Sequence, residues 1–151
     1  MHALLTEGTL KPHPFLDKCS ESFLNQLEEF AVEVEFSSGE TIFNEGGYAD
    51  RFYLILSGKV ALQCDRDAAN PLTIQVIGPG ELLGWSWLFQ PFEYHFTART
   101  LENCTALVLN GAALLIRAEE NPAFGYELMK RVSRQVVQRL QSTRNLLVAL
   151  S

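Results

Sequence analysis

The spacing of hydrophobic and polar residues changes twice along this chain. Between residues 13 and 30, apolar side chains recur at helical spacing, which predicts an N-terminal helical part. From 31 to 110 the period becomes two, and short apolar runs alternate with glycine turns, which predicts strands. Helical spacing returns from 112 to 150. We therefore expect a single domain, residues 1–151, in which helices flank a mainly β core.

The strand region indicates a particular kind of β architecture. Its apolar runs are short and evenly spaced, as in 52–56 and 72–77, and turns such as Ser57-Gly58 separate them. Short strands at regular spacing are typical of double-sheet β structures. The fold class expected is a β-roll (jelly roll) with an N-terminal helix and a long C-terminal helix.

The C-terminal region predicts a short helix over 112–119 and a long one that restarts at Asn121-Pro122. About 28 residues in one helix would span about 42 Å, more than the width of a small roll. A second copy of the same helix is the simplest partner for the excess length; the alternative is a helix folded back wholly on its own roll. The stripe expected to form this homodimer contact consists of Phe124, Leu128, Val132, Val136, Leu140 and Leu147. The arginines between them are expected in solvent: Arg131, Arg134, Arg139 and Arg144.

Composition narrows the class of protein. The chain has 151 residues, of which 47% are hydrophobic, and a formal net charge of -6, which suits a globular protein better than a nucleic-acid-binding one. Cys19, Cys64 and Cys104 are far apart and form no metal-binding or disulfide pattern, so we expect free thiols in a reducing compartment. No signal peptide and no membrane-spanning stretch is evident, and a cytoplasmic location is expected.

Catalytic patterns are missing from the sequence. His2, His13 and His95 fall on three different predicted elements, and no nucleophile elbow, P-loop or HExxH motif occurs. A metal-dependent enzyme of the cupin type would require clustered histidines. A non-enzyme is the better interpretation, with no metal or cofactor expected, and elemental analysis would test the cupin alternative.

The order of these parts resembles the cyclic-nucleotide-binding domain family, which includes bacterial catabolite-activator-type regulators and regulatory subunits of cyclic-nucleotide-dependent kinases. The likeness covers about residues 13 to 148 and depends on an ordered set of motifs. These are His13-Pro14-Phe15-Leu16, Gly39-Glu40-Thr41-Ile42-Phe43, Glu45-Gly46, Asp50, Phe52-Tyr53-Leu54-Ile55, Gly58-Lys59-Val60, Gly80-Glu81 and Gly84.

The resemblance implies a ligand site that this sequence alters. In the family, backbone N–H groups after the glycine matching Gly84 bind the cyclic phosphate, a glutamate holds the ribose hydroxyl, and an arginine pairs with the phosphate. Trp85 stands at the glutamate position and Phe96 aligns with the arginine, while Thr97 matches a small hydroxyl residue. Losing such a charged contact costs on the order of 2–5 kcal/mol, so weak or absent cyclic AMP and cyclic GMP binding is expected.

Aromatic residues crowd the same segment: Trp85, Trp87, Phe89, Phe92, Tyr94 and Phe96. They either line a pocket for a planar or apolar ligand or fill the roll and leave no cavity. His95 and Arg99 are the nearby positive or switchable groups, and a slip of one residue would turn His95 inward. The candidate pocket consists of Leu82, Gly84, Trp85, Ser86, Trp87, His95, Phe96, Thr97 and Arg99.

Two functions remain open from the sequence. The first is a stand-alone, dimeric regulatory module that senses a small molecule and transmits its state near Asn121-Pro122 to the long helix. The chain stops where transcription factors of the family begin their helix-turn-helix, so it is either part of a longer protein or a stand-alone module, and no direct nucleic-acid contact is expected from it. The second is a degenerate domain that binds no metabolite and serves as a dimerising or docking subunit.

Overall fold

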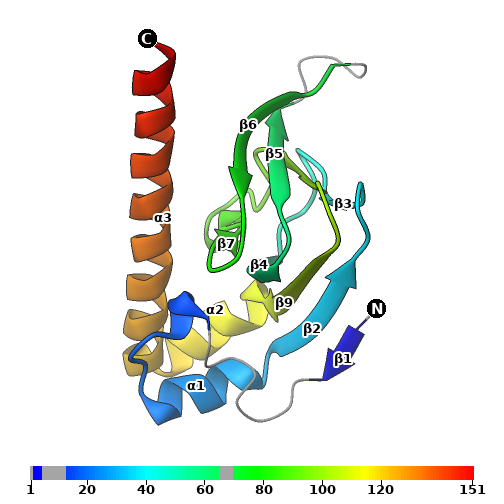
Figure 1. Cartoon of the computed structure of the whole chain (residues 1–151). Coiled ribbons are helices and arrows are strands. Elements are labelled where there is room, and N and C mark those ends of the chain that lie inside the picture. Colours follow the sequence, from blue (N-terminus) through cyan, green and yellow to red (C-terminus); the bar gives the residue numbers. More distant parts are fainter. Residues whose placement is uncertain (1, 5–12, 65–69) are drawn as a thin grey trace.

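The computed structural model describes residues 2–4, 13–64 and 70–151, and within them two antiparallel sheets form a roll (Figure 1). The five-stranded sheet has the order β1-β2-β9-β4-β7, and the four-stranded sheet has the order β3-β8-β5-β6. The first comprises β1 (His2–Leu4), β2 (Ala31–Phe36), β9 (Cys104–Asn110), β4 (Arg51–Ser57) and β7 (Leu82–Leu83). The second comprises β3 (Thr41–Phe43), β8 (Thr97–Thr100), β5 (Val60–Cys64) and β6 (Leu72–Ile77). The predicted mainly-β jelly roll is confirmed.

Helices gather at one end and along one side of the roll. They are η1 (Pro14–Leu16), α1 (Glu21–Glu28), η2 (Ser86–Leu88), α2 (Gly111–Glu120) and α3 (Pro122–Leu150). Asn121 begins α3, because its side-chain oxygen accepts a hydrogen bond from the Phe124 amide at 3.2 Å and Pro122 presets the first turn. Figure 1 shows α3 running up beside the roll, with α1 and α2 near its lower end.

Strand β4 of the five-stranded sheet is buried on both faces. Along β4, Phe52 and Leu54 belong to a core shared with the helices, whereas Tyr53 and Ile55 belong to the core inside the roll. When successive side chains of a strand enter two apolar cores in turn, its sequence is continuously hydrophobic, as it is from Phe52 onward. The helical core fixes α1, α2 and the first half of α3 against the sheet.

Helix α3 turns one polar face toward the roll. Arg131, Gln135 and Arg139 follow one another at intervals of four residues, and they are only 6%, 7% and 7% exposed. The expectation that Arg131 and Arg139 lie in solvent is therefore wrong, whereas Arg134 and Arg144 are exposed as expected. Every residue of α3 beyond Arg139 is exposed.

The predicted apolar stripe divides along the helix. Phe124, Leu128 and Val132 are buried in the chain's own core, and Val136 packs at its margin. Leu140 and Leu147, in contrast, are 67% and 63% exposed. Only the second part of the stripe is thus free to contact another molecule.

Candidate functional site

The segment expected to hold a ligand lies where β7 ends. Gly84 follows β7 with a φ of +89°, a left-handed conformation that glycine adopts without strain. A Cβ added at Gly84 would lie 3.4 Å from the ring of Tyr94, so this turn is also closely packed. Next come Trp85 and the short turn η2, a segment that we call the cassette (Gly84–Phe89).

Helix α3 is joined to this segment through the backbone of Leu82. The Leu82 N–H donates to the side-chain oxygen of Gln135 at 3.2 Å, and the Leu82 carbonyl accepts from Nη2 of Arg139. Because β7 is an edge strand of its sheet, these two side chains satisfy groups that a further strand would otherwise pair. We call this arrangement the α3 latch (Leu82, Gln135 and Arg139).

The charge of Arg139 is only partly compensated in this setting. Its guanidinium lies 5.2 Å from the ring centre of Trp85, and its Nε is 3.9 Å from a carboxylate oxygen of Glu81. Burial lowers the pKa of Arg139, and the Glu81 carboxylate offsets part of that effect. Nη1 of Arg139 is buried and has no hydrogen-bond partner among the described residues. Arg139 is the residue of this candidate site that the sequence did not reveal, since it was expected in solvent.

The clustered aromatic residues separate into different parts of the molecule. Trp87 enters the helical core, where its ring stacks on Phe52 with centroids 4.8 Å apart and its Nε1–H donates to the Gly84 carbonyl at 3.2 Å. Tyr94 enters the roll, where it stacks on Phe43 with centroids 3.7 Å apart. Phe89 remains 70% exposed. The two cores therefore take up Trp87 and Tyr94, which are not available to line a shared pocket.

Strand β8 and the residues before it settle the register that the sequence left open. Ala98 is buried in the roll, and Phe96 packs against that core with its ring centre 5.6 Å from that of Phe43. Thr97 is also buried, and its hydroxyl oxygen accepts from the Glu45 amide at 3.0 Å. His95 and Arg99 are exposed on the outside.

The nine candidate pocket residues therefore do not converge on one site. Trp85 and Leu82 lie beside α3, with Gly84 buried and Ser86 half-buried in the same turn. The remaining ones belong to the two cores or the outer surface, and the slipped register that would turn His95 inward is not the one adopted. What the geometry does provide is contact between the cassette and α3.

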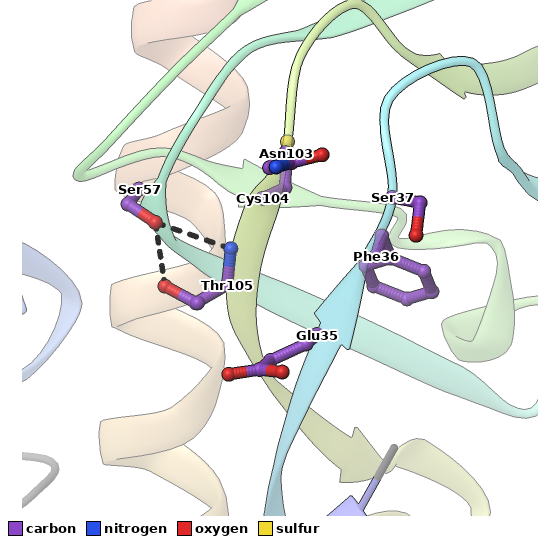
Figure 2. Close-up of a pocket in the computed structure, with 7 residues that line it drawn as sticks. All are labelled: Glu35, Phe36, Ser37, Ser57, Asn103, Cys104 and Thr105. Carbon is purple, nitrogen blue, oxygen red and sulfur yellow. Dashed lines mark hydrogen bonds between the residues drawn. The ribbon is translucent and has the colours of Figure 1, made fainter.

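A hollow of about 430 Å³ lies elsewhere, where β2 and β4 end and β9 begins (Figure 2). Figure 2 shows the side chains of Ser57 and Thr105 turned toward each other, and their hydroxyl oxygens are 2.7 Å apart. Its lining is Glu35, Phe36, Ser37, Ser57, Asn103, Cys104 and Thr105. No local sequence pattern marks this hollow, because its polar residues come from three strand ends far apart in the chain. Within the described parts of the chain, no group of three or more potential metal-ligating side chains occurs.

Comparison with known proteins decides the family. The sequence profile described as "Cyclic nucleotide-binding domain" matches residues 33–121. The chain belongs to this family. The expected resemblance is thereby confirmed.

Two curated relatives of this domain are regulators. The chain is 29% identical over 117 residues to the CRP-like cAMP-activated global transcriptional regulator of Mycobacterium tuberculosis, covering 78% of this chain and 50% of that protein. It is 26% identical over 133 residues to the anaerobic regulatory protein of Bacillus subtilis, covering 87% and 56% respectively. The chain thus spans about half the length of the curated relatives it matches.

Solved structures show the same fold. A putative cyclic nucleotide-binding protein from Geobacter metallireducens superposes with a TM-score of 0.80 at 29% identity, covering 90% of this chain and 98% of that one. The catabolite activator protein of Thermus thermophilus superposes with a TM-score of 0.69 at 23% identity, covering 91% and 62%. In the described part of this chain, no helix is both long and apolar enough to span a membrane.

Proposed function

We propose that this domain is a regulatory module that senses a small molecule at the cassette and reports the state of the cassette through α3. The α3 latch carries the proposal, because it ties Leu82, two residues before the cassette, to Gln135 and Arg139 on the helix. A ligand that moved the cassette would have to break or rebuild these two hydrogen bonds. A conformational switch requires a packed contact that can adopt two alternative arrangements.

Weak or absent binding of cyclic AMP and cyclic GMP is part of this proposal. Trp85 packs against Arg139 where the family pattern has an acid, and Phe96 packs against the roll's core where the pattern has a guanidinium. The nearby Arg99 side chain is exposed on the other face of its strand. A cyclic phosphate buried beside these rings would lack its usual counter-charge, which is costly.

Titration calorimetry tests the ligand part of the proposal. The purified protein would be titrated with cyclic AMP, cyclic GMP and cyclic dinucleotides, and no sub-micromolar binding of cyclic AMP or cyclic GMP is expected. Hydrogen–deuterium exchange would then follow the Leu82 amide for any compound that binds. Sub-micromolar cyclic AMP binding would contradict the weakened site, and a bound ligand that left the Leu82 amide unchanged would contradict the coupling.

Dimerisation through α3 is the second part of the proposal. Val137, Leu140 and Leu147 project from α3 away from the roll and are 52%, 67% and 63% exposed. Burying such residues against a second α3 would remove apolar surface from water. In sedimentation velocity, the double variant Leu140→Glu/Leu147→Glu should be monomeric, whereas Ile116→Glu, a change at an exposed position of α2, should leave the dimer intact.

A degenerate, ligand-free docking subunit is the second candidate. The packing of Trp87 and Tyr94 into the two cores favours it, because those rings leave no shared aromatic pocket. The two functions differ in a measurable way. A dimer whose melting temperature and exchange pattern stayed constant across a screen of metabolites would favour this second function over sensing.

A further inference from the structure

Exposed residues on the outward face of α3 recur at regular intervals, and they include positions outside the predicted apolar stripe. Its positions are separated alternately by four and three residues, and they lie opposite the buried face that holds Arg131, Gln135 and Arg139. The outward positions are Tyr126, Lys130, Ser133, Val137, Leu140, Arg144 and Leu147, and all of them are exposed. Alternate spacing of three and four is the pattern of a two-stranded coiled-coil seam.

Arg144 interrupts the apolar part of this seam. It lies between Leu140 and Leu147, one turn of helix from each, and is itself exposed. Within residues 2–4, 13–64 and 70–151, the structure gives Arg144 no hydrogen bond and no ion pair. Beyond Glu127, α3 contains Lys130 and four arginines but no aspartate or glutamate. A second α3 paired in parallel and in register would therefore offer Arg144 no carboxylate.

We propose that two copies of Arg144 form an oxyanion site on the axis of a parallel α3 dimer. This inference depends on the dimer of the proposed function. In a parallel, in-register pair, equivalent seam positions face each other, so the two guanidinium groups meet between the leucine layers. Like charges at this position weaken the dimer, and one shared anion removes the repulsion. The ligand is a tetrahedral dianion, either inorganic phosphate or the phosphate group of an ester.

The chemistry of arginine suits this role. A guanidinium offers five N–H donors in a planar fork that matches phosphate oxygens, and two opposed forks can donate to different oxygens of one anion. Because the site exists only when two chains meet, anion binding and dimerisation are linked. Phosphate at ten times its dissociation constant should strengthen the dimer about tenfold.

Sedimentation velocity over a range of protein concentrations measures this linkage. The dimer dissociation constant would be determined in chloride and in inorganic phosphate at equal ionic strength, with glycerol 3-phosphate as the ester. The variants are Arg144→Leu and a matched control, Arg134→Leu, which removes the same charge from an exposed position outside the seam. We expect phosphate to tighten the wild-type and Arg134→Leu dimers about tenfold. The Arg144→Leu dimer should be tighter in chloride and insensitive to phosphate.

The outcomes separate the inference from the dimer on which it depends. A wild-type dimer unaffected by phosphate and glycerol 3-phosphate, or an equal response of the two variants, overturns the anion site and leaves the dimer standing. Monomers in every buffer, for wild type and for Arg144→Leu, overturn the dimer and the site together. Tightening by phosphate but not by glycerol 3-phosphate supports a site for the free anion, and tightening by both supports one that also accepts esters.

Discussion

Arg139 and Leu82 are 57 positions apart in the chain, yet the guanidinium of Arg139 donates directly to the Leu82 carbonyl. The Leu82 amide is held by Gln135, one turn earlier on the same helix. A side chain from α3 therefore occupies each backbone hydrogen-bonding position that β7 presents at the edge of its sheet. The orientation of α3 relative to the cassette depends on these two bonds as well as on apolar packing.

Removing the arginine of the latch should destabilise the fold. Arg139→Ala leaves the Leu82 carbonyl without its donor and opens space beneath Trp85, so we expect a loss of about 2–3 kcal/mol in the free energy of unfolding. Arg134→Ala, an exposed change on the same helix, should stay within about 0.5 kcal/mol of wild type. Urea unfolding measures both, and equal stability of the two variants would show that the latch contributes nothing.

The burial of Arg131 and Arg139 marks the limit of what could be predicted from the sequence. The roll, its glycine turns and α3 follow from local periodicity, and the structure has them. Nothing local distinguishes Arg139 from the exposed Arg134. The difference arises because Arg139 reaches the backbone of Leu82, and Arg131 reaches that of the N-terminal segment.

The aromatic residues show the same limit in the candidate site. Trp87 and Tyr94 stand seven positions apart in one segment, but they enter cores on opposite faces of the five-stranded sheet. The strand that precedes them, β7, has only two residues and gives no periodic signal. The sequence could therefore predict that rings gather near the cassette, but not which core each of them fills.

Replacing Arg131 should destabilise the fold even when the substitution is conservative. Its Nη1 donates to the carbonyls of Phe15 at 2.7 Å and Asp17 at 2.9 Å, and its guanidinium pairs with Glu127 at 2.7 Å. Lysine keeps the charge but lacks the planar fork that makes these contacts together. We expect Arg131→Lys to lower the free energy of unfolding by about 1–3 kcal/mol.

The matched control for that variant is Lys130→Arg, the reverse exchange at the neighbouring exposed position of α3. It should change stability by less than about 0.5 kcal/mol. Urea unfolding under identical conditions compares the two. An Arg131→Lys protein as stable as Lys130→Arg would show that charge alone, and not the fork, holds the N-terminal segment to α3.

Gly111 should be intolerant of alanine although it lies in a helix, where alanine normally stabilises. A Cβ added there would lie 2.6 Å from the Trp87 ring, well inside contact distance. Trp87 is packed against Phe52 and cannot retreat without disturbing the helical core. We expect Gly111→Ala to cost about 1–3 kcal/mol.

The size of the tryptophan accounts for that cost, so a smaller residue should relieve it. Trp87→Leu will itself destabilise, but adding Gly111→Ala to it should cost less than adding the same change to wild type. A double-mutant cycle from urea unfolding gives this coupling. Strictly additive effects would show that the strain lies in the α2 backbone and not in the contact with Trp87.

His13 should make the stability of the fold depend on pH. Its ring is 3% exposed, and its Nδ1 accepts a hydrogen bond from the Phe15 amide at 3.0 Å, so the folded state holds the ring neutral. Burial lowers the pKa of His13 from 6.5 to about 4, partly offset by the backbone of Ile55 and Glu81. Between these two values the unfolded chain binds the proton and the folded chain does not. Stability contributed by the neutral ring is therefore complete above pH 6.5 and falls as the pH drops toward 4, by up to about 3 kcal/mol.

Comparison with the exposed histidine isolates this effect from the titration of carboxylates. The free energy of unfolding would be measured in urea at several pH values between about 4 and 7 for wild type, His13→Gln and His95→Gln. Wild type and His95→Gln should lose stability in parallel as the pH falls, because the change at the exposed position 95 leaves the buried His13 ring in place. His13→Gln should start lower at neutral pH, since glutamine fits the site less well, and should show a shallower slope across this range. Three parallel curves would mean that the folded state accommodates a protonated His13, contrary to its burial against the Phe15 amide.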